Sequence, residues 1–289
     1  MPTINAENAS ERLLKLQYRL AQIEKKERSY EDFLTFVKLM WPEFIAGNHH
    51  KIIADKLQRI ASGDLKRLIV NMPPRHTKSE FASFLFPAWM MGRNPNMKII
   101  QATHTTELAV GFGRKVKNLL DRDDYKELFD TRLAADSKAS GRFDTDRGGM
   151  YYAVGVGSNL AGRGGDLVII DDPHSEQTLM SNNGFDDAWD WYTGGPRQRL
   201  QPGGAIVVVM TRWHEKDLTG QLIRSQARDD KADQWEVVEL PAIMPSGKSC
   251  WPEYWSLDDL ERVKASIPPS KWNAQYQQDP TGDDNSILR

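Results

Sequence analysis

Hydrophobic residues recur every three or four positions through the first 62 residues of the chain. Leu13, Leu16, Leu20 and Ile23 follow this spacing, with charged residues between them. The same spacing returns twice before residue 62. Because side chains three and four positions apart share one face of an α-helix, these stretches predict a series of amphipathic helices.

The rhythm changes after Arg67, where short apolar runs rich in β-branched residues begin to alternate with helical patterns. The apolar runs read "RLIVN", "KIIQAT", "MYYAVGV", "LVIID", "AIVVVM" and "WEVVEL". Helical patterns between them begin near Lys78, run from Thr105 to about Leu120, surround Trp189 and cover "EKDLTGQLIRSQA". Strands that are apolar throughout and separated by helices are typical of a parallel sheet covered on both faces. The predicted fold class is therefore α/β, with a mostly parallel central sheet flanked by helices.

Two local patterns add detail to this α/β region. The helix that begins at Thr105 is expected to bury a face formed by Leu108, Phe112, Val116 and Leu119. The stretch "RFDTDRGGMYYAVG" predicts a β-hairpin, because "DRGG" supplies turn residues between two extended pieces.

The pattern weakens beyond Leu240. There the chain runs through "PAIMPSGKSCWPEYW" into two short helical patterns and ends just after "QDPTGDDNS", a stretch typical of a linker. We therefore divide the chain into an N-terminal helical region (1–62), an α/β core (63–243) and a C-terminal segment (244–289).

Composition and charge narrow the class of protein. The chain has 289 residues, of which 39% are hydrophobic and 27% charged, as in an ordinary soluble globular protein. Lys and Arg number 38 against 40 Asp and Glu, so any contact with DNA must come from local patches. The single cysteine, Cys250, excludes a disulfide framework and a cysteine-cluster metal site. No run approaches the ~18 apolar residues that cross a bilayer and the N-terminus is unlike a signal peptide, so we expect a cytosolic protein.

The stretch "NMPPRHTKSEF" lies between a predicted strand and a predicted helix, where a phosphate-binding loop stands. In such a loop, backbone N–H groups and a helix N-terminus converge on an anion, a lysine adds a charge, and a hydroxyl helps to hold magnesium. Lys78 and Ser79 supply the last two groups. Met72 and Thr77, however, occupy the glycine positions of the G-x-x-x-x-G-K-[ST] pattern, and a β-branched residue resists the geometry that glycine permits. By itself the stretch is equally compatible with a turn that contains a lysine.

An acidic pair follows a second apolar run, in "DLVIIDDPH". Asp171 and Asp172 are expected at the carboxyl edge of the sheet, where open α/β folds place ligands. In P-loop enzymes the first acid holds magnesium and the second polarises the attacking water. A strand that ends in an ordinary Asp-Asp-Pro turn is the alternative. The occurrence of both half-motifs in the right order favours a nucleotide site.

Two further polar groups accompany these strands. Glycines flank Arg163 in "GVGSNLAGRGGDLVIIDD", and we expect its guanidinium at the sheet edge, near the phosphates of this chain or of a neighbouring subunit. There it would stabilise charge on a transferred phosphoryl group; a surface arginine in a flexible loop is the alternative. In "AIVVVMTRWHEKDL", Thr211 is expected beside the acid-bearing strand, where a hydroxyl can sense the γ-phosphate, whereas Trp213 and His214 are interpreted as packing and capping residues.

Over these stretches the sequence resembles the large terminase subunits of tailed double-stranded-DNA bacteriophages, the motors that package genomes into procapsids. The resemblance extends from about Phe33 to Pro280 and rests on six blocks in order: "GNHHKIIADKL", "NMPPRHTKSE", "QATHTTELAVGFGRKVKNLL", "GVGSNLAGRGGDLVIIDDP", "RLQPGGAIVVVMTRWHEKDLTG" and "WNAQYQQDP". It implies a P-loop NTPase fold of the additional-strand type, with a small helical lid made from the N-terminal helices and the segment after Leu240.

The resemblance also implies roles for individual residues. As nucleotide-binding residues it implies Arg75, His76, Thr77, Lys78 and Ser79, with His49 and His50 in the region that recognises adenine. As catalytic residues it implies Lys78, Asp172 and Arg163, the last acting across subunits. As Mg²⁺ ligands it implies Ser79 and Asp171. As coupling residues it implies Thr211 and Arg212.

The implied function is Mg²⁺-dependent ATP hydrolysis that moves double-stranded DNA into a procapsid. The implied partners are the DNA, the portal protein, the small terminase subunit and further copies of this chain in a ring, expected to be pentameric. The implied location is the host cytoplasm, with no membrane partner. Large terminases also carry a C-terminal nuclease domain; because this chain ends where that domain would begin, we expect no nuclease activity in it.

Two departures from the family pattern leave an alternative open. Thr77 replaces a glycine, and Asp172 stands where many relatives carry the longer glutamate. The alternative is a degenerate P-loop module that binds DNA or packaging partners without efficient ATP hydrolysis. A two-lobed helicase is disfavoured, because the residues after Leu240 are too few and too poor in strand patterns for a second lobe.

Overall fold

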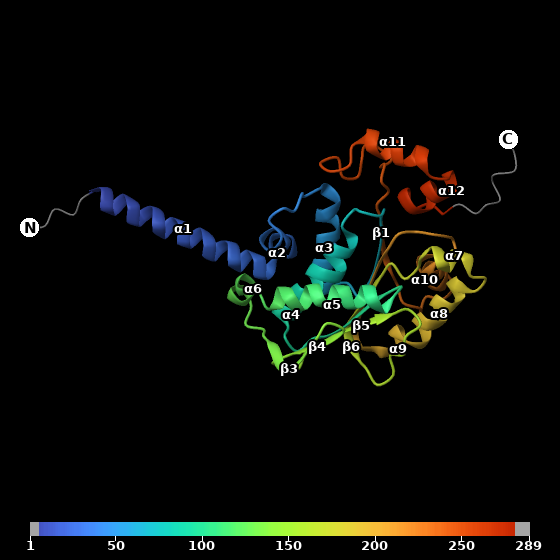
Figure 1. Ribbon diagram of the computed structural model, residues 1–289, viewed down its shortest axis with the longest axis horizontal. Helices are drawn as coiled ribbons and strands as arrows, with labels where there is room; N and C mark the ends of the chain where they lie inside the picture. The colour runs from blue at the N-terminus through green and yellow to red at the C-terminus, as the bar shows by residue number, and fades with distance from the viewer. Residues whose placement is uncertain (1–5, 281–289) are drawn as a thin grey trace, which may run out of the picture.

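A single twisted sheet runs through the molecule (Figure 1). The computed structural model describes residues 6–280, with side chains from residue 11 onward except at position 138. The sheet has eight strands in the order β3-β4-β5-β2-β6-β7-β1-β8. From β5 to β8 all neighbours are parallel, whereas β4 is antiparallel to both β3 and β5. The strands are β1 (Arg67–Asn71), β2 (Lys98–Thr103), β3 (Leu133–Ala139), β4 (Arg142–Thr145), β5 (Met150–Gly155), β6 (Gly165–Asp171), β7 (Leu200–Met210) and β8 (Glu236–Glu239).

The central strands are apolar throughout because both of their faces are covered. On β6, Leu167 and Ile169 belong to one buried cluster, and Val168 and Ile170 belong to a second cluster on the opposite face. Alternate residues of a strand point to opposite faces, so each strand must be hydrophobic on both. The predicted α/β class with a mostly parallel sheet is confirmed.

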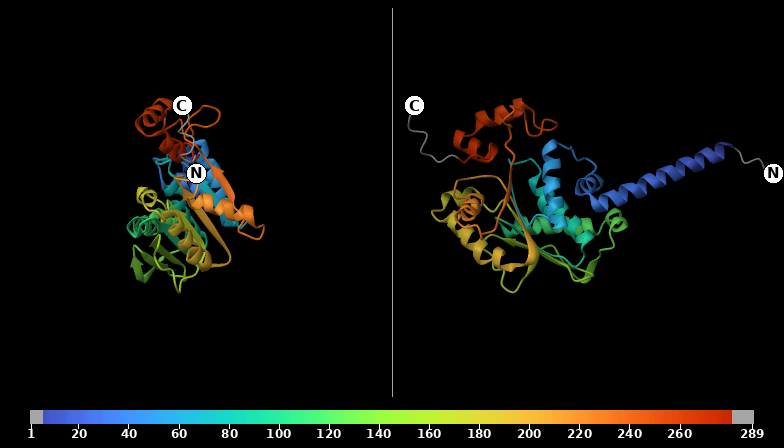
Figure 2. Two further views of the ribbon diagram at one scale, coloured as in Figure 1. Left: turned by 90° about the vertical axis from the view of Figure 1, so that its right-hand side faces the viewer. Right: turned by 180° about the vertical axis from the view of Figure 1, so that it is seen from behind.

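Helices form a layer on each face of the sheet (Figures 1 and 2). The first layer contains α2 (Phe33–Met40), α3 (Asn48–Ser62), η1 (Glu80–Leu85), which continues into α4 (Phe86–Arg93), and α5 (Thr106–Leu120). The second contains α8 (Gly184–Gly194) and α10 (Leu218–Arg228). The short helices are α6 (Asp123–Leu128), α7 (Glu176–Met180) and α9 (Pro196–Arg199).

Helix α5 exists as predicted, and Val116 and Leu119 of its predicted face are buried. Leu108, in contrast, is 46% exposed, and Ala109 and Gly113 are buried on that turn instead. A Cβ atom on Gly113 would lie only 2.1 Å from the carbonyl oxygen of Ser140. The small residues allow the helix to lie close against the sheet edge, and this close approach outweighs the larger apolar area of the leucine. The predicted hairpin is confirmed: β4 and β5 pair antiparallel, with Asp144 opposite Met150.

The two ends of the described chain lie outside the sheet layers. Helix α1 (Ala6–Glu31) projects away from the body (Figures 1 and 2). The C-terminal segment, with α11 (Leu257–Ser266), α12 (Pro269–Lys271) and η2 (Trp272–Tyr276), has its own small cluster of Ala242, Leu260 and Trp272. The division at residues 62 and 243 stays a prediction, because α2 and α3 share the main core with the α/β region: Phe33, for example, packs edge-on against Phe81.

None of the helices within residues 6–280 combines the length and the apolar character that a membrane span requires.

Candidate nucleotide site

The loop after β1 and the acids at the end of β6 meet at the carboxyl edge of the sheet, although β7 lies between their strands. The Lys78 Nζ atom lies 2.9 Å from Asp172 Oδ2. The Ser79 hydroxyl donates to Asp171 Oδ1 over 2.9 Å. The two half-motifs that the sequence places far apart are therefore in direct contact, and the interpretation of either one as an isolated turn is wrong.

The loop of residues 72–79 adopts an unusual backbone conformation. Arg75 has a φ of 60° and Thr77 a φ of 69°. This left-handed region is costly for residues other than glycine, and most of all for a β-branched one. Thr77 therefore has the backbone that the glycine of the common pattern would adopt, and the surrounding structure must stabilise it.

A buried histidine supplies this stabilisation. The backbone N–H of Gly47 donates to His50 Nδ1 over 2.8 Å, so the ring carries its proton on Nε2. His50 Nε2 then donates to Thr77 Oγ1 over 2.7 Å, and the Thr77 hydroxyl donates to the carbonyl oxygen of His76 over 2.5 Å. The ring stacks on Phe81, with centroids 4.9 Å apart. Helix α3 and the phosphate loop are thus joined by a directed chain of hydrogen bonds.

Three histidines lie together in this supporting layer. Burial is the main cause that lowers the pKa of His49 to about 4, that of His50 to about 2 and that of His76 to about 4. Their rings are close to Trp251, with centroids 5.0 to 6.3 Å away. They are therefore neutral at physiological pH, as a support inside an aromatic layer must be.

A cavity of about 390 Å³ opens above the loop. The loop and the start of η1 contribute Arg75, Thr77, Lys78, Ser79 and Glu80 to its lining, and a largely aromatic part consists of Trp41, Glu43, Ile45, Trp251 and Tyr254.

His49, His50 and His76 do not line this cavity. Their rings are buried behind the loop, and the expected roles of His49 and His50 at adenine and of His76 at the nucleotide stay predictions. The aromatic part of the lining was missed in the sequence, since Trp41 and Trp251 come from opposite ends of the chain. The only local signal was the run of aromatic residues in "CWPEYW".

Asp171 is completely enclosed at the end of β6. It accepts hydrogen bonds from the hydroxyls of Ser79 and of Ser83, the latter over 2.6 Å. Gln101 on β2 donates to the Ser83 hydroxyl over 2.9 Å. Burial, and next to it the neighbouring charge of Asp172, raise the pKa of the Asp171 carboxyl above its ordinary value. Sequence reasoning missed Ser83 and Gln101, because their polar character matters only where the helix and β2 meet.

Asp172 has a different environment. Its backbone φ is 42°, and its side chain is 31% exposed. One carboxylate oxygen accepts from the backbone N–H of Thr211 over 2.7 Å, and the other faces Lys78. This carboxylate is therefore held by two groups that can exchange partners, at the open side of the site.

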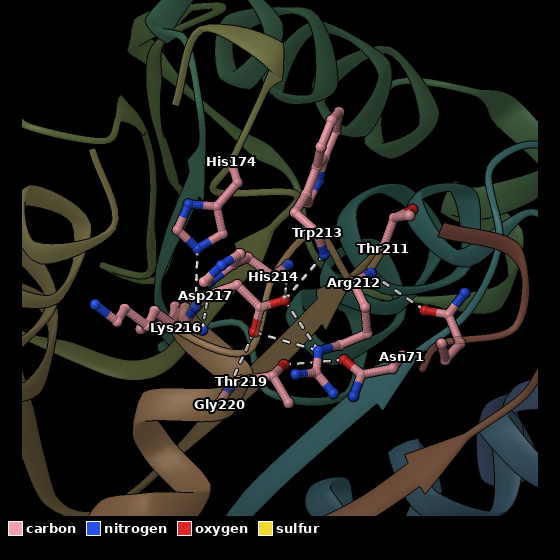
Figure 3. A network of polar contacts seen from close by, with 12 residues as sticks. Asn71, His174, Thr211, Arg212, Trp213, His214, Lys216, Asp217, Thr219 and Gly220 are labelled. Carbon is pink, nitrogen blue, oxygen red and sulfur yellow. Dashed lines mark hydrogen bonds and ion pairs between the residues drawn. The ribbon is translucent and has the colours of Figure 1, made fainter. Parts of the chain in front are cut away.

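Thr211 and Arg212 follow β7, and Figure 3 shows Arg212 facing Asp217. The backbone N–H of Thr211 binds Asp172. The Thr211 hydroxyl donates to the carbonyl oxygen of Met72 over 3.2 Å, at the start of the phosphate loop. The Arg212 guanidinium pairs with the fully buried Asp217 over 2.9 Å, and its backbone N–H donates to Gln278 Oε1 over 3.2 Å. These residues thus contact both the catalytic corner and the C-terminal segment.

Arg163 does not lie in this site. It directly precedes β6, whereas Asp171 ends that strand, so the two are at opposite ends of the sheet. Its guanidinium lies over the ring of Tyr152, 3.8 Å from the centroid, and it lines a different cavity beside Lys98 and Met150. The expectation that Arg163 approaches the phosphates of its own chain is wrong, because residues before a parallel strand lie at its amino end.

The oxygen atoms at this corner fit a magnesium ion. Asp171 and Ser79 offer a carboxylate and a hydroxyl, the hard donors that Mg²⁺ prefers. In the described part of the chain no group of three or more His, Cys, Asp or Glu side chains is arranged to hold a metal ion. A metal bound here would therefore complete its coordination with phosphate oxygens and water.

Comparisons with known proteins identify chains that are similar in sequence and fold. No protein-family model matches the chain. The chain is 25% identical over 162 residues to the large terminase subunit of Enterobacteria phage T3, covering 55% of this chain and 28% of that protein.

Among solved structures, the large terminase of bacteriophage HK97 superimposes with a TM-score of 0.59 at 13% identity, over 86% of this chain and 55% of that one. An arginine-to-alanine mutant of the large terminase ATPase domain from Thermus phage P74-26 gives a TM-score of 0.57 at 14% identity, over 85% of this chain and 98% of that domain.

The chain therefore spans about a quarter of the large terminase subunit of phage T3 and about half of the large terminase of HK97. At these identities the solved structures establish the fold. The resemblance to large terminase subunits is confirmed: the chain is similar in sequence to one of them and has the P-loop NTPase fold of their ATPase domains.

Proposed function

We propose that this chain is the ATPase part of a large terminase subunit, which hydrolyses ATP to move double-stranded DNA into a procapsid. The observation that carries the proposal is the contact of Lys78 with Asp172, 2.9 Å, beside that of Ser79 with Asp171, 2.9 Å, beneath a cavity of about 390 Å³. Phosphoryl transfer requires a lysine, a hydroxyl and two carboxylates close together, and here all four lie at the same edge of the sheet. The degenerate-module alternative lacks comparable support, because Thr77 has a φ of 69°, in the left-handed region that a glycine at this position would adopt without strain.

Lys78 is placed to change partners when ATP binds. A triphosphate over the loop would compete with Asp172 for the ammonium group, because phosphate oxygens carry more negative charge than one carboxylate. Asp172 would then be free to accept a hydrogen bond from the attacking water, with Thr211 N–H fixing its other oxygen. Lys78, moved to the phosphates, would offset the charge that develops there.

Asp171 and Ser79 would hold Mg²⁺, which would supply positive charge against the β- and γ-phosphate oxygens. The burial that raises the pKa of Asp171 disfavours its charged form, and a divalent cation removes this penalty. Metal and nucleotide are therefore expected to bind together.

The aromatic part of the lining is suited to a nucleobase. Trp251 and Tyr254 stack on each other with centroids 4.5 Å apart, and both line the cavity together with Trp41. Glu43 belongs to the same part of the lining and can accept from an exocyclic amino group such as that of adenine. The C-terminal segment would thus close over the base.

The remaining roles belong to an assembly. In a ring, expected to be pentameric, Arg163 of one subunit would reach the phosphates of its neighbour, since it lies on the far end of its own sheet. The portal protein, the small terminase subunit and the DNA would be the other partners, in the host cytoplasm. Thr211 and Arg212 would couple the state of Asp172 to the C-terminal segment.

The decisive experiment measures phosphate release from ATP by the purified chain, with and without DNA. Hydrolysis should require Mg²⁺ and fall by about 10²-fold or more in Lys78→Ala, whereas the matched surface variant Arg114→Ala should keep it. Binding of ATP by the unaltered chain with no phosphate release under either condition would reject the proposal and favour the non-hydrolysing module.

A further inference from the structure

Helix α1 extends from the body without lateral support. Its base is anchored, because Lys26 pairs with Glu127 over 2.5 Å and Trp89 Nε1 donates to the carbonyl oxygen of Ser29 over 3.0 Å. Between Glu11 and Lys25, in contrast, every side chain is exposed. Figure 2 shows the helix projecting from the body in the view from behind.

This exposure is unusual for the residues involved. Leu13, Leu16, Leu20 and Ile23 are between 53% and 61% exposed. A helix of this length without tertiary packing is marginal in water, because most helical stability comes from burying an apolar face. With Leu14, 63% exposed, the helix keeps five large aliphatic residues on its surface and therefore gains stability when another surface covers them.

The spacing of these residues identifies the kind of surface that fits. Leu13 and Leu20 are seven positions apart, and Leu16 and Ile23 repeat the same interval. In a heptad these are the a and d positions, which form the narrow seam of a coiled coil and not the broad face of a helix on a sheet.

The charges beside the seam identify the partner. The g positions hold Arg12 and Arg19, and the e positions hold Gln17 and Glu24. In a parallel coiled coil of identical helices, g of one strand faces e of the next, so Arg19 meets Glu24 and Arg12 meets Gln17. In an antiparallel pair, arginine would face arginine. The seam is therefore complementary to itself in one orientation and one register.

We propose that residues 11–25 of α1 form a parallel, in-register coiled coil with α1 of another copy of this chain. This interface goes beyond the ATPase function and does not depend on it. It would hold subunits together through a stalk about 22 Å long, at 1.5 Å per residue, separate from the nucleotide site.

The mass of the full chain, measured by sedimentation over a range of concentrations, tests the proposal. The unaltered chain should assemble, and Leu16→Glu combined with Leu20→Glu should stay monomeric, because charges enter the seam. Tyr18→Gln is the matched control: Tyr18 is 67% exposed but occupies the outward f position. This control should assemble normally. An unaltered chain that stays monomeric, or a Tyr18→Gln variant as impaired as the seam variant, overturns the proposal.

Orientation and register are tested by exchange of charges. Arg19→Glu and Glu24→Arg should each weaken assembly by about fivefold, and the double exchange should restore it, because the pair is re-formed with opposite signs. Failure of the double variant to recover contradicts the parallel register.

Disulfide cross-linking through a cysteine at the seam tests the parallel arrangement independently. Leu16→Cys should form an intermolecular disulfide under mild oxidation, since equivalent d positions face each other only in a parallel pair, while Tyr18→Cys should not. The native Cys250 interferes little, because burial raises the pKa of its thiol to about 11. Arg163→Ala should leave this assembly intact, which separates it from the ring interface of the proposed motor. Equal cross-linking at both positions would contradict the proposal.

Discussion

The loop corner of the site, residues 72–79, and the acid corner, Asp171 and Asp172, are stabilised by different kinds of contact. Behind the loop lie neutral, buried rings: His50 orients Thr77, and Phe81 and Trp251 enclose the histidine. At the acid corner, charged groups hold one another, as Lys78 holds Asp172. Contacts of the first kind should not depend on what binds, whereas those of the second kind are expected to exchange if a phosphate or a metal enters. The comparison teaches that the loop can be preorganised while the acid corner rearranges.

The largest effect is expected at the acid corner. Asp172→Asn should lower kcat for ATP hydrolysis by about 10³-fold, because an amide cannot accept the proton of the attacking water. Binding of ATP, followed by fluorescence of the cavity tryptophans, should remain, since the loop is untouched. Asp230→Asn, an exposed carboxylate remote from the site, is the control and should behave as the unaltered chain. Loss of binding together with kcat would show that the acid also shapes the loop, and would weaken the contrast between the corners.

Arg75 of the loop corner lines the cavity, and we expect a second subunit to supply a further arginine to the phosphates. Arg163→Ala should lower DNA-stimulated hydrolysis by about 10²-fold or more. Mixing Arg163→Ala with Asp172→Asn subunits should restore part of the activity, because the second variant keeps its arginine and the first keeps its acid. Mixtures that stay inactive would contradict a role across subunits.

A smaller effect is expected from removing the support behind the loop. His50→Asn keeps an oxygen that can accept from the Gly47 N–H but cannot reach Thr77, and it should raise the Kd for ATP by about tenfold, the value of one buried hydrogen bond. His50→Gln, whose amide nitrogen lies near the position of Nε2, should lose less.

The variant Thr77→Gly tests whether His50 acts on ATP binding through Thr77. Glycine adopts a φ of 69° without strain, so the difference between the two His50 variants should vanish in the Thr77→Gly background. If His50→Asn weakened binding equally with and without Thr77, the histidine would be a general packing residue and the loop would not depend on it.

The last expected effect concerns the pH dependence of stability and not activity. His49, His50 and His76 have depressed pKa values in the fold, so between pH 6.5 and about 4 the unfolded chain takes up protons that the folded chain does not. The free energy of unfolding should therefore fall as the pH falls below 6.5, by up to about 1.4 kcal/mol per pH unit for each histidine. Urea unfolding at pH 7 and pH 5.5 measures this slope. His50→Asn should reduce this slope by the contribution of one histidine. An unchanged slope would contradict a neutral His50 ring in the folded chain.

The sequence predicted those parts of the fold and site that depend on neighbouring residues. The alternation of apolar runs and helical patterns is local, and so is the position of Asp171 and Asp172 after "LVII". The contact between Lys78 and Asp172 followed from one topological rule, that parallel strands share their carboxyl edge.

The sequence was a poor guide where the position of a residue depends on packing between segments that are distant along the chain. Leu108 loses its buried position to Ala109 because the helix approaches the sheet closely. The burial of His49 and His50 in an aromatic layer cannot be read from a pair of histidines, and their adenine role stays a prediction. Arg163 is the instructive case, since the same topological rule that joined Lys78 to Asp172 already places a residue before β6 at the other end of the sheet.

One feature at the end of β7 links the reaction to the remainder of the chain. The amide N–H groups of two consecutive residues, Thr211 and Arg212, are bound by Asp172 and by Gln278 respectively. The two contacts therefore lie on adjacent peptide planes that meet at the Thr211 Cα. If Asp172 changes partner on nucleotide binding, a rotation about this one residue would be passed to Gln278, so mechanical output would begin one residue away from the proposed chemistry.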